Sequence, residues 1–134
     1  MNKNELGHFI LRVILGFIFF IHGLSKFQGG ISNTAGFFDS IGIPGFMAYV
    51  VAVIELAGGI AVILGIGTKM VSVLFAFIML GAIFTAKLSA GLLGNGQMAG
   101  YELDLLLLAA SIYFVLAKES PLSLGSKLIQ SKAN

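Results

Sequence analysis

Four long apolar stretches constrain the fold of this chain more than any other feature. They cover about residues 6–27, 46–66, 69–88 and 101–117. A helix needs roughly 20 apolar residues to cross the hydrocarbon core of a bilayer, whereas membrane β-barrels use alternating strands of about ten residues. The backbone inside lipid must satisfy its own hydrogen bonds, which leaves helices for runs of this length. The sequence therefore predicts an all-α integral membrane protein, a bundle of four transmembrane helices within one domain spanning residues 1–134.

The composition supports a lipid environment and excludes several other classes of protein. Hydrophobic residues make up 57% of the chain and charged residues 10%, against about 25% charged residues in soluble domains. The net charge is +2, but Lys and Arg are scattered and form no basic patch, so nucleic acid is not an expected partner. The chain has no Cys, which excludes disulfides, thiolate metal ligation and iron–sulfur clusters within it.

Two segments outside the apolar stretches complete the predicted architecture. Residues 32–42 carry Phe37, Phe38 and Ile41 among Asp39 and Ser40. This pattern predicts a short amphipathic helix that lies at the membrane surface between the first two spans. Residues 118–134 form a predicted cytoplasmic tail.

The lysines predict the orientation of the bundle, because cytoplasmic loops of membrane proteins carry an excess of Lys and Arg. One side of the predicted bundle holds Lys3, Lys69, Lys118, Lys127 and Lys132, and the other holds Lys26 and Lys87. The first side should be cytoplasmic. An even number of spans also places both termini on one side, so the sequence predicts a multi-pass protein of the cell membrane with both termini in the cytoplasm.

Ionisable side chains within the spans or at their ends are the candidate functional residues, because a charge in the bilayer interior costs about 2.5–3.5 kcal/mol or more. Seven such residues stand out: Arg12, His22, Lys26, Glu55, Lys87, Glu102 and Asp104. At about 1.5 Å per residue, Glu55 lies near the middle of its span and Arg12 in the inner half. The other five lie in the outer half, which predicts a mixed-charge cluster near the outer surface.

Helical periodicity predicts that these polar residues face the bundle interior. At about 100° per residue, one stripe of the first span contains Arg12, Gly16, Phe19, Gly23 and Lys26. One face of the second span contains Ala48, Ala52, Glu55 and Gly59. Small residues on a membrane helix allow a neighbouring helix to approach closely, so both stripes are predicted helix contacts.

Each candidate residue has a structural interpretation beside a functional one. Lys26 and Lys87 could extend to the headgroups as interfacial anchors, and Glu102 and Asp104 suit a helix N-terminus. Arg12 and Glu55 could form a structural ion pair, since a separation of about 9 Å along the membrane normal can be bridged by two long side chains.

His22 and Glu55 are the predicted catalytic pair. His22 has an unperturbed pKa near neutrality and is the best proton carrier, although a hydrogen-bonded structural role is equally open. Glu55 lies too deep to reach the headgroups. The remaining candidates, Arg12, Lys26, Lys87, Glu102 and Asp104, are predicted binding residues.

The sequence predicts no metal site and identifies no resident cofactor. The two histidines, His8 and His22, lie 14 residues apart on one helix, or about 21 Å, so they cannot both ligate one haem iron. No Cys or His cluster has the spacing of a zinc site. The chain therefore shows no redox centre of its own.

Several segments together resemble the DoxX family of four-helix membrane proteins. They are Arg12, the His22–Phe27 segment, Gly42-Ile43-Pro44, Glu55–Gly59, Gly65–Lys69 and Glu102. The resemblance covers roughly residues 6–117, and it departs from the family pattern at Lys69, where an Arg is usual, and at Asp104, which is an addition. It implies polar site positions at Arg12, His22, Lys26, Glu55 and Glu102. Members are described as candidate oxidoreductase components linked to quinone, catechol or thiol stress.

The residues and the resemblance together leave three hypotheses for function. The first is a membrane oxidoreductase, or a subunit of one, that acts on a quinone-like molecule in the outer half of the bundle, in detoxification or resistance to redox stress. The second is a non-enzymatic membrane anchor for soluble redox enzymes. The third is a small-molecule or proton permease. Whether the chain is itself an enzyme, and whether it forms a homo-oligomer, both stay open.

Overall fold

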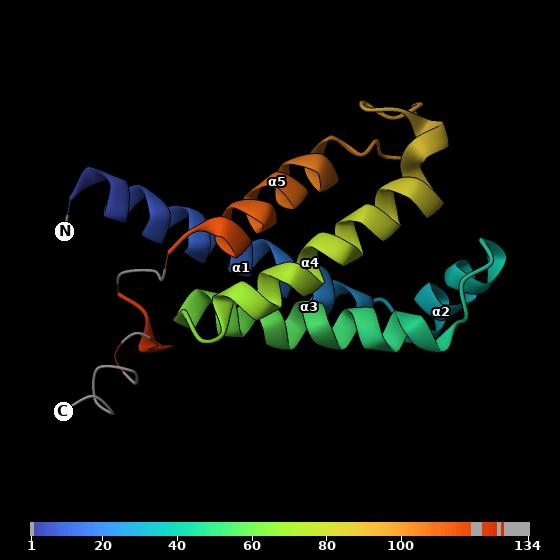
Figure 1. Cartoon of the computed structure of the whole chain (residues 1–134). Helices are drawn as coiled ribbons and strands as arrows, with labels where there is room; N and C mark the ends of the chain where they lie inside the picture. The colour runs from blue at the N-terminus through green and yellow to red at the C-terminus, as the bar shows by residue number, and fades with distance from the viewer. Residues whose placement is uncertain (1, 119–121, 126, 128–134) are drawn as a thin grey trace.

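The computed structural model describes residues 2–118, 122–125 and 127. Within these residues the chain forms five α-helices and no strand. Their bounds are α1 Lys3–Gln28, α2 Ile31–Ser40, α3 Phe46–Leu64, α4 Thr68–Ala82 and α5 Glu102–Leu116 (Figure 1). The α4 helix continues as a π-helical turn, η1 Ile83–Lys87, and a 3₁₀ turn, η2 Leu88–Ala90. The predicted all-α class is therefore confirmed, while most of the predicted tail, 118–134, lies outside the described residues.

In the part of the chain that the structure describes, three helical segments are long and apolar enough to cross a membrane: Lys3–Gln28, Phe46–Leu64 and Thr68–Ala90. The fourth predicted span corresponds to α5, which has 15 residues and is about 22 Å long, shorter than the roughly 30 Å of a hydrocarbon core. Many large apolar side chains on these helices are exposed, among them Phe77, Phe84 and Leu106. Such a surface requires lipid as its surroundings, so the chain is an integral membrane protein in contact with the bilayer.

The α1 and α3 helices run side by side at a separation that only glycine permits. A Cβ atom added at Gly16 would lie 2.7 Å from the carbonyl oxygen of Gly59, and one added at Gly23 would lie 2.6 Å from the backbone nitrogen of Leu56. Both distances are far below van der Waals contact. The predicted small-residue stripe therefore is the contact between the two backbones, as in other membrane helix pairs.

The hydrophobic core of the bundle joins these two helices to α4 and α5. The rings of Phe19 and Phe75 stack with their centroids 3.7 Å apart, and Met79, Leu107 and Phe114 are buried in the same cluster. The end of α5 lies beside the start of α1, since the Tyr113 hydroxyl is 3.2 Å from His8 Nδ1. The chain thus returns to the end of the molecule from which it starts.

The α2 helix lies between the ends of α1 and α3 and has no buried residue. Asp39 near its end accepts a hydrogen bond from the backbone N–H of Gly45 at 2.9 Å. This bond fixes the turn that leads from α2 into α3. As a result, α2 lies beside the end of α1 and the start of α3, at the end of the molecule far from the N-terminus (Figure 1).

Candidate functional site

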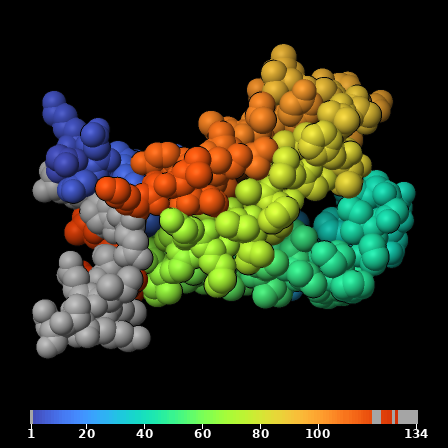
Figure 2. All heavy atoms as spheres, viewed as in Figure 1, coloured from blue at the N-terminus to red at the C-terminus, as the bar shows by residue number. Residues whose placement is uncertain are grey.

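One cavity brings together five of the seven predicted site residues. It has a volume of about 490 Å³ and lies among α1, α2, α3, α4 with η1, and the start of α5. Figure 2 shows the corresponding hollow between the teal segment that includes α2 and the yellow segment at the end of α4. The site residues that line it are His22, Lys26, Glu55, Lys87 and Asp104. The remaining lining is mostly apolar, so the cavity is a hydrophobic pocket with a few convergent polar groups, as ligand sites usually are.

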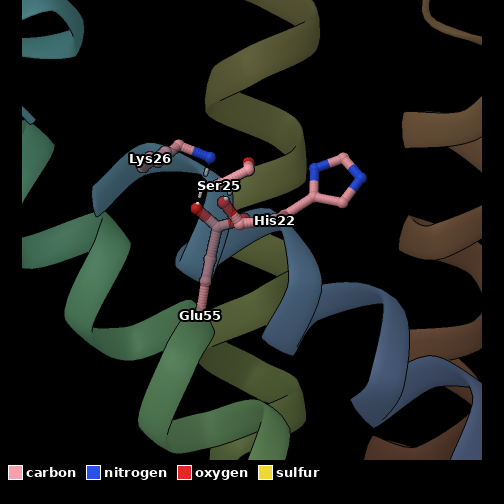
Figure 3. Close-up of polar contacts among 4 residues, drawn as sticks. All are labelled: His22, Ser25, Lys26 and Glu55. Atoms are coloured by element: carbon pink, nitrogen blue, oxygen red, sulfur yellow. Dashed lines mark hydrogen bonds and ion pairs between the residues drawn. The ribbon is translucent and has the colours of Figure 1, made fainter. Parts of the chain in front are cut away.

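The first ion pair of the cavity joins α1 to α3. Lys26 Nζ lies 2.7 Å from Glu55 Oε1, and the Glu55 side chain is 1% exposed. Figure 3 shows the two side chains extending toward each other from neighbouring helices. The close approach of α1 and α3 at Gly23 brings the two charges within reach, and the ammonium group compensates the buried carboxylate.

The second ion pair joins the end of the α4 segment to α5. Lys87 Nζ lies 2.8 Å from Asp104 Oδ2, and Asp104 is in the first turn of α5, where a carboxylate is also favoured by the helix dipole. Lys87 ends the π-helical turn η1, in which the Thr85 hydroxyl donates a hydrogen bond to the Gly81 carbonyl. A π-helical turn changes the direction in which the following side chains point, and such turns are frequent at functional sites.

His22 lines the cavity together with the residues of both ion pairs and hydrogen-bonds to neither pair. It is half-buried, and Figure 3 shows its imidazole pointing away from the Glu55 carboxylate. It is close enough to both ion pairs to interact electrostatically with Glu55, Lys26, Lys87 and Asp104. Its ring nitrogens make no hydrogen bond to any other residue that the structure describes, so they can donate to or accept from a ligand in the cavity.

The charges of the cavity balance. Two ammonium groups face two carboxylates in separate pairs, and the imidazole can be neutral or charged. A neutral ligand with hydrogen-bonding oxygens would leave both pairs intact, whereas a charged ligand would have to disrupt one of them. The electrostatics therefore favour a neutral polar head over an ionic one.

Arg12 does not pair with Glu55, so the structural ion pair between them that the sequence left open does not form. The Arg12 guanidinium donates to the backbone oxygen of Leu122 at 3.0 Å and to that of Ile63 at 3.4 Å. Glu55 is eight residues from Ile63 on α3, or about 12 Å along the helix. The packing of α1 on α3 places Arg12 opposite the far end of α3, and Lys26 takes the carboxylate instead.

Glu102 also lies apart from the cavity. Its side chain is exposed and does not line the cavity, whereas Asp104, two residues later, is buried there. Residues two apart on a helix point in different directions, so only one of the two carboxylates can face the bundle. The structure therefore places Asp104 in the cavity and Glu102 at the exposed start of α5.

Sequence reasoning missed the apolar walls of the site. Phe37 and Phe38 of α2 and Ile41, the residue that follows this helix, line the cavity, although their pattern predicted only a surface helix. A signal was available in the short loops on either side of α2, since they hold that helix close to the ends of α1 and α3. No group of three or more His, Cys, Asp or Glu suited to a metal ion occurs in the described part of the chain.

Comparison with known proteins places this geometry in a family. The family model for DoxX matches residues 7–88, which include most of α1 and all of α2, α3, α4 and η1. The chain belongs to the DoxX family. The match ends just after Lys87, so it covers the residues of the first ion pair and the lysine of the second.

Curated relatives extend the similarity over the whole chain. The protein named "Putative oxidoreductase CatD" of Bacillus subtilis is 50% identical over 100% of this chain and 96% of its own length. The uncharacterized membrane protein Rv3486 of Mycobacterium tuberculosis is 35% identical over 69% of this chain and 56% of its own length. The inner membrane protein YqjF of Escherichia coli is 31% identical over 52% of this chain and 53% of its own length. No solved structure matches the chain.

Proposed function

We propose that this DoxX protein is a membrane oxidoreductase, or the membrane subunit of one, that acts on a quinone-like molecule in the outer cavity. The single observation that carries the proposal is the cavity itself. An apolar pocket of about 490 Å³ holds a half-buried histidine and two charge-compensated ion pairs. The name of the Bacillus subtilis relative, which denotes an oxidoreductase, is consistent with redox chemistry.

A quinone suits both parts of the cavity. Its ring is apolar and packs against walls such as Phe38 and Ile54, while its carbonyl oxygens accept hydrogen bonds from His22 and Lys26. Reduction to the hydroquinone takes up electrons and protons in equal number. His22 supplies protons as a general acid, and the Glu55 carboxylate exchanges protons with the reduced form. The electrons come from a reduced partner protein or a second substrate, and removal of reactive quinones would serve detoxification under redox stress.

The proposed membrane arrangement follows from the same elements. We propose four spans, with α5 crossing in a locally thinned bilayer, and α2 lying at the outer surface as an amphipathic helix. The contact of Tyr113 with His8 supports this arrangement because it brings the end of α5 back to the start of α1. The lysine distribution then places both termini in the cytoplasm of a cell-membrane protein.

Quinone binding can be measured with a single introduced fluorophore, because the chain contains no Trp. Phe38→Trp places an indole on the wall of the cavity, where a bound quinone would quench it. We expect saturable quenching when a short-chain menaquinone analogue is titrated into protein in lipid nanodiscs. Leu106→Trp is the matched control, since Leu106 lies on the exposed surface of α5 away from the cavity and should report only quinone dissolved in the lipid.

His22→Ala in the Phe38→Trp background tests the polar end of the site. Loss of one hydrogen bond to a carbonyl costs about 1 kcal/mol or more, so the dissociation constant should rise about tenfold. Equal quenching in both tryptophan reporters, or unchanged affinity in the His22→Ala protein, would exclude the proposed site. The alternative of a non-enzymatic anchor for soluble redox enzymes would then gain support.

A further inference from the structure

The cavity continues as an apolar groove between α3 and α4. We call the following six lining residues the lateral groove: Val50, Val51 and Ile54 of α3, and Leu74, Phe77 and Ile78 of α4. Three of them are open to the surroundings, with exposed fractions of 40% for Val50, 39% for Leu74 and 67% for Phe77. Both helices belong to candidate membrane spans, so the open side of the groove faces acyl chains.

The position of Leu74 shows how far the groove reaches into the membrane. Leu74 lies six residues beyond the start of α4 at Thr68, or about 9 Å along the helix. The polar groups of the cavity lie on the other side of the groove, on α1, on the inward face of α3 and at the end of the α4 segment. A ligand with its head at these groups therefore has the apolar residues of the lateral groove between it and the exposed side chains that face the lipid.

We infer that the substrate is a lipid-soluble quinone with an apolar side chain, which lies in the lateral groove while the quinone ring contacts the ion pairs. This inference rests on the proposed function and specifies its substrate class. A water-soluble quinone would fill the polar end alone and leave the groove to lipid. A side chain leaving lipid for the groove exchanges one apolar environment for another, so the groove contributes fit and gives little hydrophobic driving force.

Because the contribution is steric, the test narrows the groove and leaves the head site intact. Val50→Phe and Leu74→Phe add bulk on opposite walls of the groove, each in the Phe38→Trp reporter. Leu106→Phe in the same background is the control, because Leu106 is as exposed as Phe77, at 67%, and does not line the cavity. The two probes are a naphthoquinone without a side chain and the same naphthoquinone with an isoprenoid side chain, in nanodiscs and at equal concentration in the lipid.

We expect the groove variants to weaken binding of the tailed quinone about tenfold, the equivalent of overpacking by a bulky side chain, and to leave the tail-less quinone unchanged. The control should change neither. Equal weakening of both probes, or of neither, would overturn the inference while the proposed function stands. If neither probe binds saturably to the Phe38→Trp protein without groove substitutions, both the proposed function and this inference are wrong.

Discussion

Breaking the ion pair between Lys26 and Glu55 from one side or the other should destabilise the protein unequally. Lys26→Met leaves a carboxylate that is 1% exposed without its counterion. An uncompensated buried charge of this kind costs about 3–5 kcal/mol. The other lysine of the cavity, Lys87, is already engaged with Asp104, so it is not available to replace Lys26.

Glu55→Gln should destabilise the protein less than Lys26→Met does, because the group that it leaves unpaired is a partly exposed lysine. The Lys26 side chain is 23% exposed, so its flexible stem can carry the ammonium toward the headgroups. The new amide also offers an oxygen that can accept from it. We expect a loss of about 1–2 kcal/mol, the range for a weakened hydrogen bond to a charged group. The double variant Lys26→Met/Glu55→Leu should recover most of the stability, because apolar side chains replace a buried pair at little cost.

The assay is reversible unfolding in mixed micelles of mild detergent and SDS, followed by far-ultraviolet circular dichroism. Lys69→Met is the matched control, since Lys69 is exposed at the start of α4, and a surface substitution there should stay within about 0.5 kcal/mol. Equal losses from Lys26→Met and Glu55→Gln would refute the reasoning. So would a double variant less stable than Lys26→Met alone.

Three further predictions concern helix packing and the inner end of the bundle. Gly16→Ala should destabilise by about 1–3 kcal/mol through overpacking, because its Cβ would meet the Gly59 carbonyl. Gly81→Ala should stabilise the protein by about 0.5–1 kcal/mol, because an added Cβ there meets nothing within 4 Å and Ala favours a helix. Unfolding in mixed micelles measures both glycine variants. A change in stability of the same sign for Gly16→Ala and Gly81→Ala would contradict the packing argument. Arg12→Leu should destabilise the protein by about 1–3 kcal/mol, because it removes the donor to the Leu122 and Ile63 carbonyls. Arg12→Lys should recover only part of that loss, since an ammonium cannot reproduce the guanidinium geometry. Full recovery of stability by Arg12→Lys in the same assay would contradict this prediction.

Helical periodicity predicted which faces are buried, because it is a property of each helix alone. Arg12, Gly16, Phe19 and Gly23 are all buried on α1. On α3 the predicted face, Ala48, Ala52, Glu55 and Gly59, is buried as well. The prediction that a face is buried is the same whichever helix packs against it. It could therefore be made without knowing the neighbouring helix.

The pairing of charges could not be predicted from the sequence in the same way. The partner of Glu55 depends on how far α1 is shifted along α3, and that shift is set by backbone contacts at Gly16 and Gly23. Arg12 and Lys26 lie 14 residues apart on α1, or about 21 Å, and helical periodicity alone does not say which of them the packing brings opposite Glu55. The pairing of Asp104 with Lys87 was not predicted for a different reason. Lys87 ends a π-helical turn, which regular α-helical periodicity does not include.

The two ion pairs also suggest why charges persist in this part of the bundle. One ion pair joins α1 to α3, and the other joins η1 to α5. Each ion pair therefore connects two neighbouring helical segments. Apolar side chains would hold such helices together at least as well, and without the cost of placing charges among membrane spans. Both pairs nevertheless line the cavity. Their position is therefore explained better by a ligand that needs polar contacts inside a lipid-facing pocket than by any need to join the helices.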